Sequence, residues 1–256
     1  MGTLVVVGTG YRVAGQITVE SLAAIRRAER LFFLAGDPAT RDWLKSLKPD
    51  AESLHGAYAP GKSRRVSYSE MRERVLGPVR LRKRVCLALY GHPGVFASLG
   101  YDTIRVATSE GHSATMLPGV SAADNLFIDL GFDPAIGCQM YEATDLLLRR
   151  RSVDLSVPLV LWQVAAVGMV DFRRERTWVA EGFELLVDHL ARLYGRKHEV
   201  TIYEAATVPL FAPRIERTPI EKLSLARVSP ASTLFIPPVE IRATDEEMRS
   251  RLRFDP

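Results

Sequence analysis

The chain has 256 residues, which is enough for one large domain or for two smaller domains with a hydrophobic core each. Hydrophobic residues make up 47% of the sequence and charged residues 25%, a composition that excludes a largely disordered protein. The formal net charge of +4 is too small to indicate nucleic-acid binding by itself.

The first half of the sequence alternates between strand and helix patterns. The run TLVVVG at 3–8 is continuously apolar, as in a strand that is covered on both faces. Such alternation is typical of a parallel sheet flanked by helices. The predicted strands are 3–8, 30–34, 85–90 and 113–117, and the predicted helices are 18–29, 67–75 and 97–110.

The pattern starts again at Pro118-Gly119, where we place a domain boundary. The strands beyond it are more widely spaced, so that several can pair antiparallel and form a mixed sheet. They are expected at 157–163, 198–205 and 232–238, with helices at 120–131 and 183–195. We therefore predict a two-domain α/β fold with a parallel-sheet domain at 1–117, a mixed-sheet domain at 118–239 and a polar tail at 240–256.

Several classes of protein are disfavoured by simple features of the chain. Cys86 and Cys138 lie far apart, which argues against a disulfide framework and against a cysteine metal site. The longest apolar stretch, 157–170, contains Gln163 and is shorter than the roughly twenty residues of a membrane-spanning helix. The N-terminus lacks the basic region of a signal peptide. We expect a cytoplasmic protein that binds neither a membrane nor a nucleic acid.

The segment GAYAPGKS at 56–63 fits the phosphate-loop pattern G-x-x-x-x-G-K-[ST]. A phosphate loop needs a buried strand before it and a helix that begins at its lysine, Lys62, so that backbone N–H groups point at the phosphate. Here the preceding residues 49–55 are polar, and we expect no helix before 67. No apolar strand ends in an aspartate that would hold Mg²⁺. The match is accidental.

Two other glycine-rich loops follow buried strands, where open α/β sheets bind ligands. The loop 7–15 lacks the third glycine and the acidic residue of a dinucleotide site, and it predicts a tight turn beside some other ligand. The loop 89–100 carries Tyr90 and His92, although a plain turn with a surface histidine is the alternative. In MLPGVSAADN at 116–125, Ser121 either caps a helix or binds a ligand.

Taken in order, VVVGTG, YGHPGVF, LPGVSA, LWQ and STLFIPP resemble the tetrapyrrole methylase superfamily over residues 3–238. The resemblance implies a class III methyltransferase with two α/β domains and a cofactor bound between them. YGHPGVF, MLPGVSA and YEATD at 141–145 more narrowly resemble the borosin peptide backbone α-N-methyltransferases.

The borosin resemblance implies a catalytic set of Tyr58, Arg64 and Tyr68, with Arg65 as a competitor for the arginine. An amide nitrogen is a poor nucleophile, so an enzyme must remove its proton and stabilise the charge that develops on the carbonyl oxygen. A neighbouring arginine lowers a tyrosine pKa, and a guanidinium can stabilise an oxyanion. We assign Tyr68 as the base and Tyr58 and Arg64 as donors, with Tyr58 as the alternative base. The other interpretation of these residues is a solvated loop.

The same resemblance implies S-adenosyl-L-methionine as cofactor, S-adenosyl-L-homocysteine as its product, and no metal. The implied cofactor-binding residues are Tyr90, His92, Val95, Ala122, Gln163, Tyr203, Ser232 and Thr233. They fall at strand ends and loops, as the residues of small-ligand sites do. Gln163 and Tyr203 also have ordinary structural interpretations.

Fungal borosin enzymes carry their substrate peptide beyond the methyltransferase region, whereas this sequence has no apolar peptide after 238. We therefore predict the split form, a homodimer that methylates two copies of a separate precursor in trans. Basic runs at 80–84 and 149–151 either steer an acidic leader or are solvated turns. The rival functions are corrinoid or porphyrinogen C-methylation, RNA ribose methylation, and a non-catalytic peptide scaffold that keeps the cofactor for structure.

Overall fold

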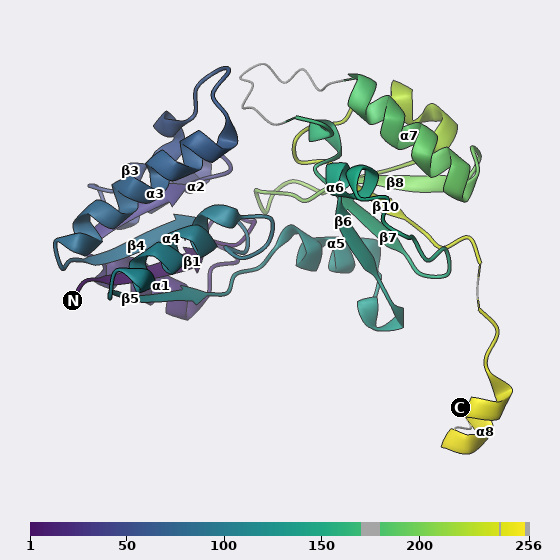
Figure 1. Ribbon diagram of the computed structural model, residues 1–256, viewed down its shortest axis with the longest axis horizontal. Coiled ribbons are helices and arrows are strands. Elements are labelled where there is room, and N and C mark those ends of the chain that lie inside the picture. Colours follow the sequence, from purple (N-terminus) through teal and green to yellow (C-terminus); the bar gives the residue numbers. More distant parts are fainter. Residues whose placement is uncertain (170–179, 241, 254–256) are drawn as a thin grey trace. The chain divides into compact units, whose positions relative to one another are not determined.

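The structure, a computed structural model, describes residues 1–169, 180–240 and 242–253. These residues form two compact units, each with its own five-stranded sheet (Figure 1). Of the described residues, the first unit contains 1–132, 169 and 204–214, and the second contains 133–168, 180–203, 215–240 and 242–253.

The first unit is a parallel sheet with the strand order β3-β2-β4-β1-β5. Its strands are β1 (Thr3–Gly8), β2 (Arg30–Leu34), β3 (Glu52–Ser53), β4 (Arg84–Leu89) and β5 (Ser113–Leu117). Its helices are α1 (Val19–Arg27), α2 (Pro38–Leu47), the 3-10 helix η1 (Leu54–Ala57), α3 (Arg64–Arg80), α4 (Ser98–Ser109) and α5 (Ala122–Leu130).

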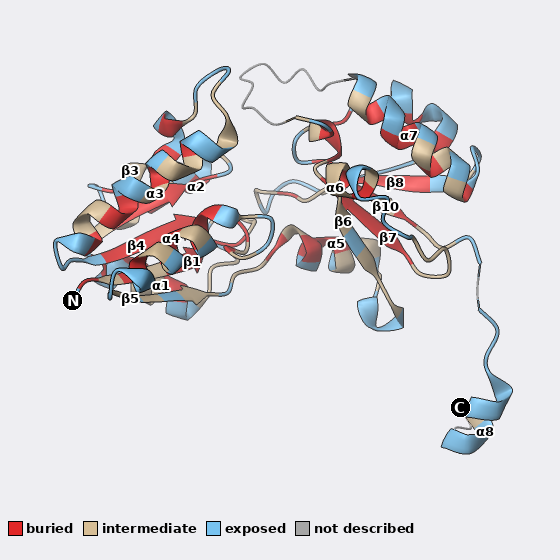
Figure 2. Cartoon of the chain, viewed as in Figure 1, coloured by how far each residue is buried: buried red, intermediate tan, exposed pale blue. Residues whose placement is uncertain are grey.

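Both faces of this sheet are buried, because successive side chains of a strand point to opposite faces. One face packs against α3 and α4 through residues such as Leu87 of β4 and Met71 of α3. The other face packs against α1 and α2 through residues such as Phe33 of β2 and Ile25 of α1. The central strands β1 and β4 are accordingly buried over most of their length (Figure 2). This double covering explains the continuous apolar runs in the sequence.

Helix α3 differs from the prediction in its length and its start. The sequence predicted a helix at 67–75, whereas α3 begins at Arg64 and continues past Pro78. It begins early because the Ser63 side chain caps it by accepting a hydrogen bond from the Val66 backbone nitrogen at 3.3 Å. Arg64 and Tyr68 are therefore helical residues, and the expectation that no helix follows the glycine-lysine pattern directly was wrong.

The second unit has a mixed sheet with the strand order β6-β7-β10-β8-β9, which confirms the predicted fold class. Strand β10 pairs antiparallel with β7 and with β8, while β6 and β7 are parallel. The strands are β6 (Gln139–Glu142), β7 (Leu159–Trp162), β8 (Glu199–Glu204), β9 (Arg214–Pro219) and β10 (Thr233–Ile236). The helices are η2 (Pro134–Ile136), α6 (Ala143–Leu148), η3 (Val164–Ala166), α7 (Ala180–Tyr194), η4 (Ile220–Leu225) and α8 (Glu246–Leu252).

The segment 118–132, which contains α5, groups with the first unit, although the sequence analysis assigned it to the second domain. It is tied to the first unit by a hydrogen bond from Gln16 Nε2 to Asn125 Oδ1 at 2.6 Å. In the predicted polar tail, the structure contains the short helix α8, which has no buried residue.

Candidate functional site

Three loops meet at the carboxyl ends of β1, β4 and β5. A Cβ atom built on Gly8 would lie 2.5 Å from the Gly91 carbonyl oxygen and 2.9 Å from the Gly119 Cα. A Cβ on Gly119 would lie 2.6 Å from the same oxygen. We call these three residues the glycine junction. Only glycine allows three backbones to approach this closely, so the junction fixes the positions of the loops that leave it.

The loop after β1 is held by the side chain of Gln16. Its Oε1 accepts hydrogen bonds from the backbone nitrogens of Tyr11, at 3.0 Å, and Arg12, at 2.9 Å. The Arg12 Nε–H is buried and has no hydrogen-bond partner in the part of the chain that the structure describes. A tight turn beside some ligand was predicted here, and the structure shows the turn.

The predicted cofactor loop after β4 presents Tyr90 and Val95 at the surface, with 54% and 40% of each residue exposed. The backbone of Tyr90 donates to the Leu34 carbonyl, and His92 Nδ1 accepts from the Gly94 nitrogen at 3.0 Å. His92 therefore shapes the turn with one ring nitrogen.

Ala122 is the first residue of α5, directly after its cap. Ser121 accepts from the backbone nitrogens of Ala123 and Asp124, and the Asp124 carboxylate accepts in return from the Ser121 nitrogen at 2.6 Å. Of the two roles left open for Ser121, the structure gives it the capping role.

The other four predicted cofactor residues belong to the second unit. Gln163 follows β7 directly in a left-handed backbone conformation, with φ of 57°. Thr233 pairs with Tyr203 across β10 and β8, and Ser232 precedes Thr233. The Ser232 hydroxyl accepts a hydrogen bond from the Ser229 backbone nitrogen at 2.8 Å. These residues gather at one end of the sheet.

The three predicted catalytic residues lie on consecutive elements of the first unit. Tyr58 follows η1, Arg64 begins α3, and Tyr68 lies one turn further along α3. The rings of Tyr58 and Tyr68 meet edge to face, with centroids 6.4 Å apart and planes at 68°. Tyr68 also lies close enough to Tyr58 to raise its pKa. The structure thus brings the two predicted phenols together.

The pKa of Tyr58 is shifted upward, although a neighbouring arginine was expected to lower the pKa of a tyrosine here. Burial raises the pKa of Tyr58 well above its ordinary value, and Tyr68 and Tyr90 raise it further. Arg64 lowers the pKa of Tyr58, as predicted for a neighbouring arginine, but burial outweighs it. The pKa of Tyr90 is raised as well: although 54% of the residue is exposed, surrounding groups desolvate its hydroxyl, and Tyr68 raises the pKa further against a lowering effect of Arg64. Tyr58 therefore stays protonated at neutral pH and acts as a hydrogen-bond donor.

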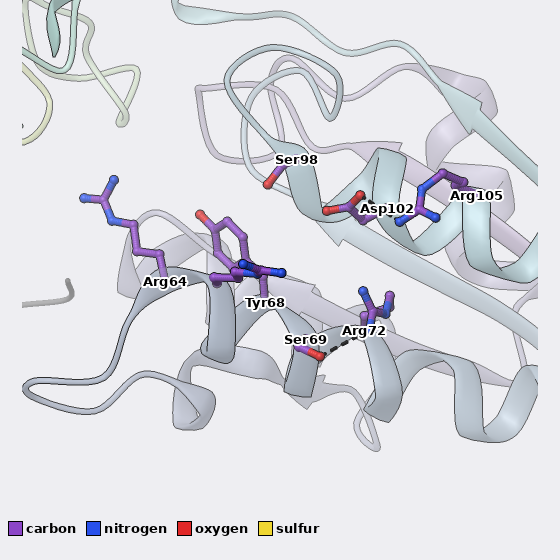
Figure 3. Close-up of a pocket in the computed structure, with 8 residues that line it drawn as sticks. Arg64, Tyr68, Ser69, Arg72, Ser98, Asp102 and Arg105 are labelled. Carbon is purple, nitrogen blue, oxygen red and sulfur yellow. Dashed lines mark hydrogen bonds and ion pairs between the residues drawn. The ribbon is translucent and has the colours of Figure 1, made fainter. Parts of the chain in front are cut away.

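A shallow groove of about 580 Å³ lies beside Tyr68. It is lined by Arg64, Arg65, Tyr68, Ser69, Arg72, Ser98, Asp102 and Arg105, which come from α3 and α4 (Figure 3). Within it, Arg72 donates to the Ser69 hydroxyl at 3.2 Å, and Arg105 lies 3.4 Å from Asp102. We call it the arginine groove.

Lys62, the lysine of the phosphate-loop pattern, is held by its own surroundings. Its Nζ donates to the Ala57 carbonyl at 2.9 Å and lies 2.5 Å from Glu70 Oε2. A phosphate-binding lysine instead presents its ammonium group to the ligand, so this geometry agrees with the rejection of the pattern.

The sequence analysis missed Tyr11 and His55. Burial, Tyr90 and Glu204 raise the pKa of Tyr11 to about 12, which places Tyr11 near the loop that carries Tyr90. The His55 ring is 6.1 Å from the Tyr58 ring, and its Nε2 lies 2.7 Å from the Ala35 carbonyl oxygen. Tyr11 follows VGTG at a strand end, which is a signal that could have identified it, whereas the contact of His55 depends on the tertiary fold.

The described residues contain neither a metal-binding cluster nor a membrane-spanning helix. No group of three or more histidine, cysteine, aspartate or glutamate side chains among them is arranged to hold a metal ion. None of the helices in these ranges is both long and apolar enough to cross a bilayer.

The model of the tetrapyrrole (corrin/porphyrin) methylases matches residues 3–224. The chain belongs to this family. A solved structure of uroporphyrin-III C-methyltransferase from Thermus thermophilus, complexed with S-adenyl homocysteine, shares the fold with a TM-score of 0.61 and 18% identity, over 92% of each chain.

Relatives of higher identity are fungal proteins. The chain is 41% identical over 98% of its length to a methyltransferase/ribosomally synthesized type III borosin cyclic peptide precursor of Anomoporia bombycina. It is 40% identical over 98% of its length to a methyltransferase/ribosomally synthesized cyclic peptide gymnopeptides precursor of Gymnopus fusipes. It spans 30% and 61% of these two relatives, less than two thirds of either. The resemblance to borosin-type proteins is confirmed at this level.

Proposed function

We propose that the protein is an S-adenosylmethionine-dependent methyltransferase that methylates backbone amide nitrogens of a ribosomal precursor peptide. The observation that carries this proposal is the contact between Tyr58 and Tyr68, within the electrostatic influence of Arg64 and Tyr90. The names of the fungal relatives, which join a methyltransferase to a cyclic peptide precursor, support the choice of a peptide as substrate.

The geometry of the two phenols supports a division of roles between them. The raised pKa of Tyr58 keeps its proton in place, so Tyr58 donates a hydrogen bond to the amide oxygen. Tyr68 is the proposed base: as its phenolate it accepts the proton of the amide nitrogen and becomes the neutral phenol. The charge then develops on the amide oxygen, where Arg64 and Tyr58 stabilise it. One such preorganised donor contributes about 3–4 kcal/mol to the transition state.

We infer that the loops of the glycine junction hold the methyl donor, whereas a role for the strand ends of the second unit remains a prediction of the family resemblance. Tyr90, His92, Val95 and Ala122 belong to the first set, and Gln163, Tyr203, Ser232 and Thr233 to the second. The close backbone approach at Gly8, Gly91 and Gly119 fits a ligand bound against main-chain groups. When bound, S-adenosylmethionine supplies a methyl group on a positively charged sulfur, and S-adenosylhomocysteine is its product.

Substrate delivery in trans and a homodimer carrying two precursors remain predictions of the sequence analysis. Mixing the purified chain with a separately purified peptide tests trans delivery, and sedimentation of that mixture measures the stoichiometry.

The function is tested by co-expressing the chain with the small open reading frames adjacent to its gene and sequencing every peptide by tandem mass spectrometry. We expect methyl groups on backbone nitrogens, located by the fragment ions on either side of each amide. Uroporphyrinogen and a single-stranded RNA are offered in parallel. Methylation of either one, with unmodified peptides, would overturn the proposal.

A further inference from the structure

The lining of the arginine groove contains more basic than acidic side chains. Four arginines line it, together with a single carboxylate, Asp102. That carboxylate lies 3.4 Å from Arg105, and Arg72 also contacts Glu73 at 3.3 Å. Arg64 and Arg65 form no ion pair with any residue in the described ranges. The groove therefore carries an excess of positive charge that nearby side chains leave unneutralised.

The arginines of α3 are placed on one side of the helix. Arg65, Tyr68, Ser69 and Arg72 are separated by three or four residues, which puts them on one face over two turns. In Figure 3, Arg64 lies at one end of the row, Arg105 at the other, and Tyr68 and Arg72 lie between them. Because α3 packs beside α4, Ser98, Asp102 and Arg105 form the opposite wall. Tyr68, the proposed base, thus opens directly onto a guanidinium-lined surface.

We propose that the arginine groove binds an acidic side chain of the substrate peptide and so sets which backbone amide reaches Tyr68. This inference rests on the proposed function, because it takes Tyr68 as the base. A planar guanidinium matches a carboxylate through parallel hydrogen bonds, and Arg72 and Arg105 face the groove from opposite walls. Their ion pairs with Glu73 and Asp102 are solvent-accessible, and such pairs are weak enough for a peptide carboxylate to displace. An Asp or Glu of an extended peptide would lie between the two arginines.

The spacing of the groove sets the position of that acidic residue. One helical turn separates Tyr68 from Arg72, a rise of about 6 Å. An extended chain covers about 3.3 Å per residue, so the acidic residue would lie about two or three positions from the methylated one.

A peptide suits the groove better than RNA does. Binding of single-stranded nucleic acid relies on several aromatic side chains on which successive bases stack. The groove offers one aromatic residue, Tyr68, among the lining residues that the structure describes.

The test measures binding of fluorescent decapeptides by anisotropy, with S-adenosylhomocysteine present. The peptides share one sequence of alanine and valine around a central valine and carry a single Glu at positions one to five on either side, or Gln at the same position. We expect a Glu two or three positions from the centre to bind about tenfold more tightly than Gln, since a charge-assisted hydrogen bond is about that strong. The preference should weaken as salt is added.

Arg72→Gln and Arg105→Gln should each reduce the preference for Glu to about twofold or less. Arg74→Gln is the matched control, because Arg74 is an exposed arginine on α3 that does not line the groove. Thermal unfolding of all three variants identifies any that fail to fold. Glu and Gln peptides that bind equally well, or do not bind, would contradict the inference. So would a wild-type preference for Glu in both Arg72→Gln and Arg105→Gln. RNA would be the better ligand if a uridine decanucleotide displaced the labelled Glu peptide at a lower concentration than unlabelled Glu peptide does, and that result would also overturn the inference.

The binding experiment and the methylation experiment can fail separately, so a failure of the groove inference can be told apart from a failure of the proposed function. If peptides are methylated but Glu peptides bind no better than Gln peptides, only the groove inference is contradicted. If Glu peptides bind better than Gln peptides but no peptide is methylated, the groove inference holds and the proposed methylation is contradicted.

Discussion

The predicted cofactor residues of the two units differ sharply in exposure. In the first unit, Tyr90 and Val95 are 54% and 40% exposed on a loop whose path the glycine junction fixes. In the second unit, Tyr203, Ser232 and Thr233 are exposed by only 1%, 1% and 4%. Both sets lie at strand ends, so position alone does not distinguish a residue that contacts a ligand from one that supports the fold. We therefore expect substitutions in the first unit to affect binding and substitutions in the second to affect stability.

The largest expected effect comes from replacing one tyrosine in each unit, the buried Tyr203 and the exposed Tyr90. Tyr203→Ala should lower the free energy of unfolding by about 3–5 kcal/mol, since it leaves a cavity in the core. Tyr90→Ala should change that free energy by less than about 1 kcal/mol while weakening the binding of S-adenosylhomocysteine. Urea denaturation and calorimetric titration measure the two quantities. Equal stability losses in both variants would show that exposure does not separate the two sets.

A second pair of variants probes the glycine junction. Gly119→Ala would place a Cβ 2.6 Å from a backbone oxygen, so it should destabilise the protein by about 1–3 kcal/mol. Gly77→Ala is the control, because no described atom outside its own helical surroundings lies within 4 Å of the added Cβ. In a helix this change should stabilise by about 0.5–1 kcal/mol. Melting temperatures distinguish the variants, and a Gly119→Ala protein as stable as wild type would remove the argument for a rigid junction.

The smallest expected effect is a loss of folding stability at alkaline pH. Burial raises the pKa of Tyr11 in the first unit and of Tyr194 in the second from 10.0 to about 12. A raised tyrosine pKa stabilises the folded state fully below pH 10, where the unfolded chain also keeps its proton. That stability is lost as the pH rises from about 10 to about 12.

The variants Tyr11→Phe and Tyr194→Phe remove these titrations one at a time. Each should lose less stability than wild type between pH 9 and pH 11 in urea unfolding. Tyr194→Phe should cost little at pH 7, because the buried hydroxyl has no hydrogen-bond partner in the described ranges. If both variants follow the wild-type pH dependence, neither phenol is buried as described.

The sequence predicted β1 and β2 residue for residue, because their apolar runs reflect burial on both faces. The edge strand β5 was also predicted with its exact bounds, although none of its residues is buried. Helix α2 was missed since its apolar residues are scattered, although Asp37 and Pro38 form a recognisable start signal. Strand β9, with the polar sequence RIERTP, carries no strand pattern at all. Its pairing depends on its neighbour in the sheet and not on its own residues.

Some residues of the candidate site were likewise predictable from the sequence, and others were not. Tyr58, Arg64 and Tyr68 were predicted because a family resemblance fixed their spacing, and the structure brings the two phenols into contact. The spacing could not reveal His55 beside Tyr58, since that contact depends on the tertiary fold. Nor could it reveal the opposite wall of the arginine groove, because α4 is distant from α3 in the sequence. The family pattern predicted the candidate catalytic residues, and the packing of the fold determined what surrounds them.

The central claim is that Tyr68 and Arg64 perform the methyl transfer to a backbone amide. The most direct test is the single-turnover rate of peptide methylation by Tyr68→Phe and Arg64→Ala, with S-adenosylhomocysteine affinity measured on the same samples. We predict that Tyr68→Phe slows methylation by about 10²–10⁴-fold, as expected for loss of a general base. Arg64→Ala should slow it by at least about 10²-fold through loss of oxyanion stabilisation, and the affinity should change little in both variants. Methylation at the wild-type rate in both would contradict the account.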